Sequence, residues 1–275
     1  MNYQLIALDM DGTLLNHELK ITQSNLEAMK KATDAGKHVV ISTGRSLSEM
    51  KHYLDDLTMV RYMILESGAC VYDLYKQQMI YQKTFIKDQV LKICEVLQKQ
   101  DIMLHIFTDG YSYSPTLQRH QMNEYQMGKY QNMFLDCVDP IDNVELFFQE
   151  HMNHIEKINF YHRSIEEREN SLQYLKDMDV VKACVEISSL ELTPQGVNKG
   201  LGIEHLCDYL NISVDQCIAV GDSNNDLEML EVVGKAIAMG NANDAIKNIA
   251  DIIVNDCEHD GVVEAINKYL LIGKE

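Results

Sequence analysis

Residues 5–15 read Leu5-Ile6-Ala7-Leu8-Asp9-Met10-Asp11-Gly12-Thr13-Leu14-Leu15, and this stretch decides the fold. Its apolar run, residues 5–8, predicts a buried strand. The strand ends at two carboxylates, Asp9 and Asp11, which a glycine and a hydroxyl residue follow. A buried carboxylate costs free energy unless it is paired or binds a cation. Two of them at the end of a core strand therefore indicate a metal site.

The composition is that of an acidic globular protein. The chain has 275 residues, 46% of them hydrophobic, which suffices for one large domain or two modest ones. Its formal charge is -18, from 42 acidic and 24 basic residues, which argues against a nucleic-acid or anionic-membrane partner. No apolar run approaches the roughly 20 residues that span a bilayer, and we expect neither a membrane anchor nor a secretory signal.

The cysteines indicate the compartment. There are seven, an odd number, and no two of them form a Cys-x-x-Cys pair. This pattern favours reduced thiols over a disulfide or zinc framework. We therefore expect a cytoplasmic protein.

The first part of the chain alternates helices and strands. Residues 21–32 predict a helix with Thr22 as its cap, and Gly36 ends it. Residues 37–42 predict a strand that runs into Thr43-Gly44-Arg45, and a further helix is expected through Met50 and Leu54. The expected elements that follow are a strand over 61–65 and a hairpin over 70–74 and 79–82.

The pattern changes from about residue 85 and changes back after Thr193-Pro194. Asp109-Gly110 predicts a hairpin turn, a loop is expected around Asp139-Pro140, and helices mix with antiparallel strands. We expect an inserted α+β domain over 84–189 and one α/β domain with a parallel sheet, made of 1–83 and 190–275. Within the latter, Asp260 is expected to cap the last helix.

Polar residues follow four of the predicted parallel strands. They are Asp9 and Asp11, then Thr43, then Ser67, and finally Asp222, Asn225 and Asp226. The carboxyl ends of parallel strands meet at one edge of a sheet, where α/β proteins bind ligands. We therefore expect these side chains to converge.

Four motifs together carry a family resemblance. They are Asp9-x-Asp11-Gly12-Thr13, Thr43-Gly44-Arg45, Lys199 in Val197-Asn198-Lys199-Gly200, and Gly221-Asp222-Ser223-Asn224-Asn225-Asp226. In this order the chain resembles the haloacid dehalogenase superfamily, and within it the Cof-type phosphatases. The resemblance implies a Rossmann-like core with an inserted α/β cap that closes over the site. It also implies a Mg²⁺-dependent phosphatase of small phosphorylated metabolites, such as sugar phosphates or phosphorylated cofactors.

The motif residues have distinct expected roles. Asp9 attacks phosphorus and forms an aspartyl-phosphate, while Asp11 protonates the leaving oxygen and later deprotonates water. Mg²⁺ is held by Asp9, Asp222 and the main-chain carbonyl of Asp11, and Asp226 orients metal-bound water. Phosphoryl oxygens are bound by Thr43, Gly44, Lys199 and Asn225, with Lys199 as the fixed positive charge.

Other interpretations remain open at this stage. Taken alone, Asp222 is an ordinary helix cap, Lys199 a solvated helix residue and Arg45 a residue that pairs at the edge of the core. Ser67 stands where family members often have Asn, which puts a substrate contact from that position in doubt. A sugar phosphomutase and a non-catalytic metabolite-binding protein are the alternative functions; the second has no need of a nucleophile beside an acid.

Overall fold

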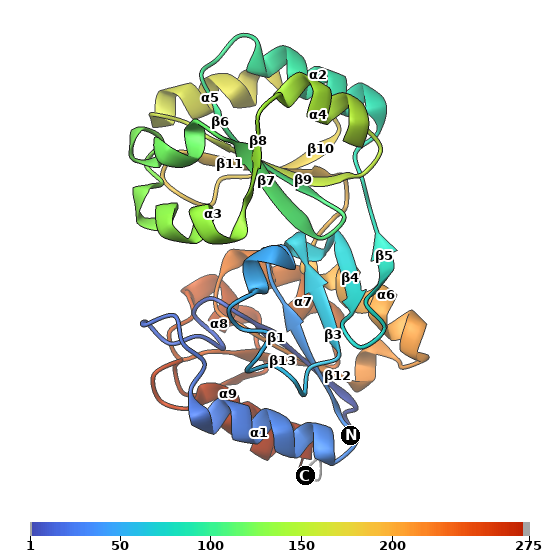
Figure 1. Ribbon diagram of the computed structural model, residues 1–275. Coiled ribbons are helices and arrows are strands. Elements are labelled where there is room, and N and C mark those ends of the chain that lie inside the picture. Colours follow the sequence, from blue (N-terminus) through green and yellow to red (C-terminus); the bar gives the residue numbers. More distant parts are fainter. Residues whose placement is uncertain (1, 272–275) are drawn as a thin grey trace. The chain divides into compact units, whose positions relative to one another are not determined.

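The computed structural model describes residues 2–271 and divides into two compact units (Figure 1). The core unit consists of residues up to Gly44, Tyr53–Gln82 and residues from Asn198 onward. The inserted unit consists of Arg45–His52 and Lys83–Val197. Each unit has its own sheet and its own hydrophobic core.

The core unit is built on a mostly parallel sheet. Among the described residues it has eight strands in the order β14-β13-β12-β1-β2-β3-β4-β5, and all neighbours from β14 to β3 are parallel. The strands β4 and β5 extend the edge as an antiparallel hairpin. The parallel strands are β1 (Leu5–Asp9), β2 (His38–Ser42), β3 (Tyr62–Leu65), β12 (Cys217–Gly221), β13 (Lys235–Ala238) and β14 (Ile252–Ile253); the hairpin is β4 (Cys70–Asp73) and β5 (Gln78–Gln82).

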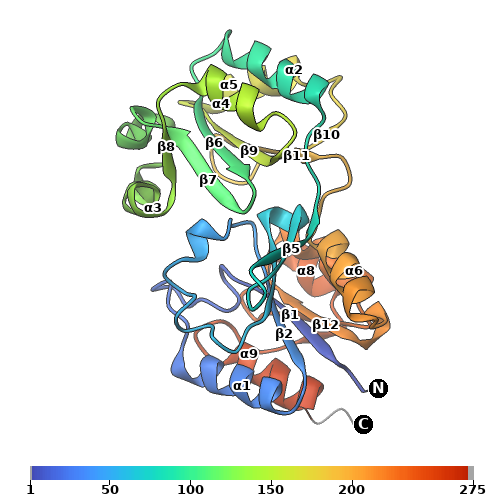
Figure 2. The ribbon, with the colours of Figure 1, turned by 45° about the vertical axis from the view of Figure 1, so that its right-hand side comes forward.

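Helices cover both faces of this sheet, as the α/β pattern predicts (Figure 2). On one face α6 (Lys199–Leu210), α7 (Leu227–Val232) and α8 (Asp244–Ile249) pack through Ile203, Leu206, Met229 and Ile246. On the other, α1 (Gln23–Asp34) lies beside α9 (Gly261–Ala265), which continues as a π-helical turn over Ile266–Leu271. No helix within residues 2–271 is both long and apolar enough to cross a lipid bilayer.

Two local expectations were wrong. The helix expected through Met50 and Leu54 is only a 3₁₀ turn, Ser48–Met50. Oε2 of Glu49 accepts hydrogen bonds from the N–H and the hydroxyl of Ser46, and such local bonds compete with a continuing helix. Asp260 does not cap α9, because its carboxylate instead accepts a hydrogen bond from the Ser24 hydroxyl.

The inserted unit has a mixed sheet with strand order β10-β11-β9-β6-β7-β8 within its described residues. The helices α2, α4 and α5 pack on one face through an apolar cluster that includes Val90, Ile106, Phe148 and Phe160. The strands are β6 (Met103–Thr108), β7 (Tyr111–Pro115), β8 (Asp139–Ile141), β9 (Ile155–Tyr161), β10 (Val180–Ala183) and β11 (Ser189–Pro194); the helices are α2 (Lys87–Leu97), α3 (Gln131–Cys137), α4 (Val144–His151) and α5 (Ile165–Tyr174). The segment expected as a loop around Asp139-Pro140 is thus strand β8, which pairs with β7.

The boundaries of the two units differ from those expected. The expected boundary at 189/190 falls inside β11, whose residues Ser189–Leu192 pair with β9 of the inserted unit. Alternating residues predict a strand but not the sheet that it joins, which explains this error. The segment Arg45–His52, expected in the core domain, belongs to the inserted unit.

Candidate active site

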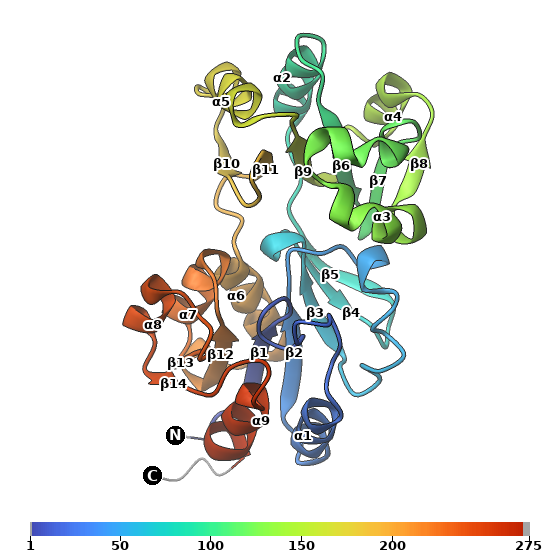
Figure 3. The same ribbon diagram turned by 90° about the vertical axis from the view of Figure 1, so that its left-hand side faces the viewer.

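The strands β12, β1, β2 and β3, at whose carboxyl ends the predicted polar residues stand, lie side by side in the core-unit sheet (Figure 3). Asp9 ends β1, Thr43 directly follows β2, and Asp222 directly follows β12. These strands are parallel neighbours, with β1 between β12 and β2, so their carboxyl ends are adjacent. Lys199 is the first residue of α6. Chain direction alone therefore brings Asp9, Thr43 and Asp222 to a common edge, and the start of α6 adds Lys199.

Lys199 joins two of the motifs through its ammonium group. Nζ of Lys199 donates hydrogen bonds to Oδ1 of Asp9, at 2.5 Å, and to Oδ1 of Asp226, at 2.6 Å. All three side chains are buried. Although burial opposes a charged amine, the two carboxylates raise the pKa of Lys199 above its ordinary value. The lysine is therefore a fixed positive charge and not a solvated helix residue.

Asp226 shapes the loop that carries Asp222. Its Oδ2 accepts hydrogen bonds from the N–H groups of Asp222, at 2.9 Å, and Ser223, at 3.1 Å. Both of its carboxylate oxygens are thus engaged, one by Lys199 and one by the backbone. Such contacts fix the direction in which the carboxylate of Asp222 points.

The loop after β1 is fitted against Asp222. Oγ1 of Thr13 donates a hydrogen bond to Oδ1 of Asp222, at 3.1 Å. Gly12 has a φ of +84°, and a Cβ placed there would lie 2.6 Å from Oδ2 of Asp222. Only glycine permits both this backbone conformation and this close approach.

The carboxylates form a group with excess negative charge. One oxygen from each of Asp9, Asp222 and Asp226 lies within 4.8 Å of the other two. Burial, together with the charge of Asp226, raises the pKa of Asp9 well above 3.8 and raises that of Asp222 to about 6. Lys199 offsets one of three negative charges, so the donor set fits a small divalent cation with oxygen ligands, such as Mg²⁺.

The remaining predicted residues line the same edge. Asp11 is exposed and lies in the loop after β1. Thr43 is buried; its N–H donates to the carbonyl of Ile64, at 2.9 Å, and its carbonyl accepts from the N–H of Ser67, at 3.0 Å. Oδ1 of Asn225 accepts a hydrogen bond from the Ser223 hydroxyl. Gly44 is the last residue of the core unit before the chain enters the inserted unit.

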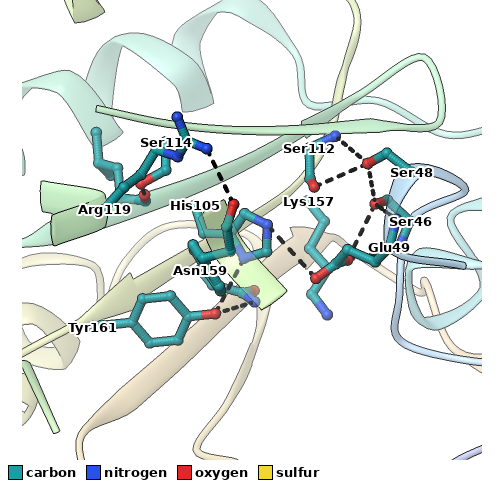
Figure 4. Close-up of polar contacts among 12 residues, drawn as sticks. Ser46, Ser48, Glu49, His105, Ser112, Ser114, Arg119, Lys157, Asn159 and Tyr161 are labelled. Carbon is teal, nitrogen blue, oxygen red and sulfur yellow. Dashed lines mark hydrogen bonds and ion pairs between the residues drawn. The ribbon is translucent and has the colours of Figure 1, made fainter. Parts of the chain in front are cut away.

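A second polar group lies within the inserted unit (Figure 4). Oγ of Ser48 lies 3.1 Å from Oγ of Ser112, and Oε1 of Glu49 lies 3.9 Å from Nε2 of the buried His105. Burial, and then the charge of Lys157, lower the pKa of His105 well below 6.5, so the ring is neutral. These residues hold the segment Arg45–His52 on the β6–β7 hairpin.

Sequence reasoning missed one residue beside the candidate site. Nδ2 of Asn241 donates a hydrogen bond to the carbonyl of Gly12, at 2.8 Å. Asn241 follows β13, which ends at the same edge as β1 and β12. The rule that polar residues after parallel strands converge would have found it, had it been applied to this strand as well.

Curated relatives match nearly the whole chain. Phosphatase YwpJ of Bacillus subtilis is 28% identical, over 98% of this chain and 100% of its own length. The 5-amino-6-(5-phospho-D-ribitylamino)uracil phosphatase YwtE of the same species is 29% identical, over 96% and 97%. The HMP-PP phosphatase of Yersinia enterocolitica is 28% identical, over 98% and 96%.

Solved structures and a family model agree with these relatives. A haloacid dehalogenase-like hydrolase from B. subtilis superposes with a TM-score of 0.83 at 26% identity, covering 97% of this chain and 100% of that one. BT1666 of Bacteroides thetaiotaomicron, described among phosphatases of the same superfamily, has a TM-score of 0.79 at 25% identity, covering 96% and 94%. The family model for haloacid dehalogenase-like hydrolases matches residues 6–266. The fold, the converging motifs and these matches show that the chain is a phosphatase belonging to the haloacid dehalogenase-like hydrolase family.

Proposed function

We propose that this protein is a Mg²⁺-dependent phosphatase that hydrolyses small phosphorylated metabolites through an aspartyl-phosphate intermediate. The observation that carries the proposal is the buried contact of Lys199 with Asp9 and Asp226, beside the carboxylate of Asp222. A phosphate monoester repels nucleophiles through its own negative charge, so hydrolysis depends on neutralising charge and on alignment. The described group offers both.

In this proposal the two carboxylates of the first loop have different tasks. Asp9 attacks phosphorus, so that a bond from its carboxylate oxygen forms as the bond to the leaving oxygen breaks. Asp11 donates a proton to that leaving oxygen and then removes a proton from the water that hydrolyses the acyl phosphate. The exposure of Asp11 suits a group that exchanges protons with substrate and water.

The residues that would hold Mg²⁺ are Asp9 and Asp222 through their carboxylates and Asp11 through its main-chain carbonyl. When bound, the ion neutralises phosphate charge and aligns the phosphoryl group with the nucleophile. Asp226 was expected to orient metal-bound water. Because its oxygens are engaged by Lys199 and the backbone, we propose instead that it acts by fixing Asp222 and the lysine.

Neutral and positive groups complete the phosphate site. Thr43, Gly44 and Asn225 bind phosphoryl oxygens by donating hydrogen bonds, and Lys199 supplies a buried positive charge. This arrangement explains how a chain of charge -18 attracts an anion, because the local charge is set by one lysine and one cation.

The names of the relatives indicate a substrate range. YwtE acts on a phosphorylated ribitylamino-uracil and the Yersinia relative on HMP-PP. We infer that this chain likewise takes small phosphorylated metabolites, sugar phosphates or phosphorylated cofactors, and not nucleic acid. All seven cysteines are free thiols, which supports a cytoplasmic location.

Phosphate release from p-nitrophenyl phosphate and from a metabolite panel tests the proposal. We expect release that requires Mg²⁺, is abolished in Asp9→Asn and persists in Asp34→Asn, an exposed carboxylate paired with Lys30. Borohydride reduction of acid-quenched enzyme, which converts an acyl phosphate to an alcohol, should modify Asp9. Release from no member of the panel contradicts the proposal, and an isomerised sugar phosphate without net release identifies a phosphomutase.

A further inference from the structure

Asn241 links the first catalytic loop to a distant segment of the core unit. Its Nδ2 donates a hydrogen bond to the carbonyl of Gly12, at 2.8 Å, and its Oδ1 accepts one from the N–H of Cys257, at 3.1 Å. Gly12 immediately follows Asp11, the residue to which we assign proton transfer. One amide side chain thus bridges the backbone of two loops that are separated by more than 200 positions in the sequence.

The loop that carries Asn241 is itself firmly held. The N–H of Met239 donates to the carbonyl of Gly221, at 3.0 Å, and the N–H of Gly240 donates to the carbonyl of Asn255, at 3.1 Å. Ala242 closes the turn through its N–H to the carbonyl of Met239, at 2.9 Å. Because the backbone around Asn241 has little freedom, its side chain can hold the Gly12 carbonyl in one place.

The loop that receives the hydrogen bond is also held by its own backbone, because the N–H groups of Leu14 and Leu15 donate to the carbonyls of Asp9 and Met10. On one side it is fixed by Thr13, whose hydroxyl donates to Asp222, and by the close approach of Gly12 to the same carboxylate. The Asn241 bond fixes the carbonyl side of Gly12. The contacts of Gly12 and Thr13 hold the Gly12–Thr13 peptide, which begins one residue after Asp11, and so constrain the backbone that carries the Asp11 carboxyl group.

We propose that Asn241 is a positioning residue that holds the Asp9–Thr13 loop so that Asp11 can transfer its proton to the leaving oxygen. This inference rests on the proposed function. Asn241 is exposed, so water competes for the bond to Gly12 and the effect of its loss is moderate. The loss of activity depends on the substrate. If the Asp11 carboxyl group is displaced, hydrolysis slows most for esters whose leaving group must be protonated.

The test compares two phosphate monoesters that differ in their leaving group. The leaving oxygen of glycerol phosphate is strongly basic and needs the proton, so that glycerol leaves as a neutral alcohol, whereas p-nitrophenyl phosphate releases a stable phenolate anion and needs the proton little. For Asn241→Ala we expect kcat/KM to fall about tenfold for glycerol phosphate and less than about threefold for p-nitrophenyl phosphate. Asn241→Ser has a side chain too short to bridge the two loops and should show the same kcat/KM changes. It replaces the alanine variant in the test if that variant folds poorly.

Asn16→Ala is the matched control. The Oδ1 of Asn16 also accepts two backbone hydrogen bonds, from Glu18 and Lys20, in the chain that continues from the same loop, whereas the carbonyl of Gly12 is bound by Asn241. We expect its ratio of the two kcat/KM values to equal that of the wild type. Equal losses for both substrates in Asn241→Ala, no loss, or the same selectivity in Asn16→Ala each overturn the inference.

Hydrogen–deuterium exchange gives a readout that does not depend on activity. Peptides covering residues 9–15 should exchange faster in Asn241→Ala than in the wild type, and unchanged exchange contradicts the inference. Wild-type enzyme that hydrolyses neither ester refutes the proposed function instead. The two failures are therefore distinguishable.

Discussion

Nζ of Lys199 lies 2.5 Å from Oδ1 of Asp9, although the two residues are 190 positions apart in the sequence. The pair joins the start of α6 to the end of β1 and is buried on both sides. Removing one partner of a buried ion pair leaves the other charge without compensation, which is more costly than the pair itself is favourable.

Lys199→Met should therefore destabilise the protein as well as inactivate it. We expect the free energy of unfolding to fall by about 3 kcal/mol at neutral pH in EDTA, measured by urea denaturation, because Asp9 and Asp226 lose their shared cation. Lys30→Met, which removes an exposed pair with Asp34, should change it by less than about 1 kcal/mol. Similar values for the two variants contradict the role given to Lys199.

Gly12→Ala and Gly36→Ala separate backbone strain from collision with the site. Both glycines have a positive φ, +84° and +78°, but a Cβ at Gly12 meets the Asp222 carboxylate, whereas one at Gly36 meets nothing within 4 Å. Both variants should lose about 1–2 kcal/mol of stability from strain. Only Gly12→Ala should also lose phosphatase activity and the rise in melting temperature on addition of Mg²⁺. Retained Mg²⁺ response in Gly12→Ala argues against Asp222 as a metal ligand.

Asp222→Asn should stabilise the metal-free protein while abolishing its activity. The substitution keeps an oxygen that can accept the Thr13 hydrogen bond and removes one of three crowded negative charges. We expect the free energy of unfolding in EDTA to rise by about 1 kcal/mol, as occurs when strain at a functional site is relieved. Addition of Mg²⁺ should stabilise the wild type but not this variant. A loss of stability in EDTA contradicts the repulsion inferred here.

His105 should make the inserted unit sensitive to mild acid. Burial and Lys157 lower the pKa of His105 in the folded protein, while the unfolded chain protonates the ring near pH 6.5. The unfolded state therefore binds more protons below that pH, and stability is lost as the pH falls through it. The other titratable groups around the ring are Glu49, whose pKa burial raises, and Tyr161, whose hydroxyl lies 3.2 Å from Nδ1.

Urea denaturation between about pH 7.5 and about pH 5.5 measures this effect. His105→Gln should reduce the loss of stability over that interval, even if it lowers stability at the upper pH. His120→Gln, at an exposed position of the same unit, should leave the pH dependence unchanged. Identical pH dependence in wild type and His105→Gln contradicts the prediction.

Sequence reasoning succeeded where one local pattern determines one local outcome. Apolar runs that end in acids or hydroxyls predicted β1, β2 and β12, and chain direction then placed Asp9, Thr43 and Asp222 at one edge. The reasoning failed where the outcome depends on distant partners. Nothing near Asp260 shows that Ser24 will bind its carboxylate, and nothing within residues 180–192 shows that β11 joins β9.

Asn241 illustrates a further limit. Its bridge between Gly12 and Cys257 follows from the position of β13 beside β12, which only the assembled sheet defines. The residue type is common in loops, so its importance lies in the two backbone groups that it meets. The roles assigned to the site residues stay predictions: those of Asp9, Asp11, Thr43, Gly44, Lys199, Asp222, Asn225 and Asp226.

The membership of Arg45–His52 in the inserted unit matters for building chimaeras in which this unit is exchanged. The inserted unit is encoded in two separate pieces of sequence. In the shorter piece, Ser48 contacts Ser112 and Glu49 lies beside His105, both of which belong to the longer piece. A chimaera that received residues 83–197 alone would lack these partners. Both pieces of sequence are therefore needed if a transplanted inserted unit is to keep these contacts.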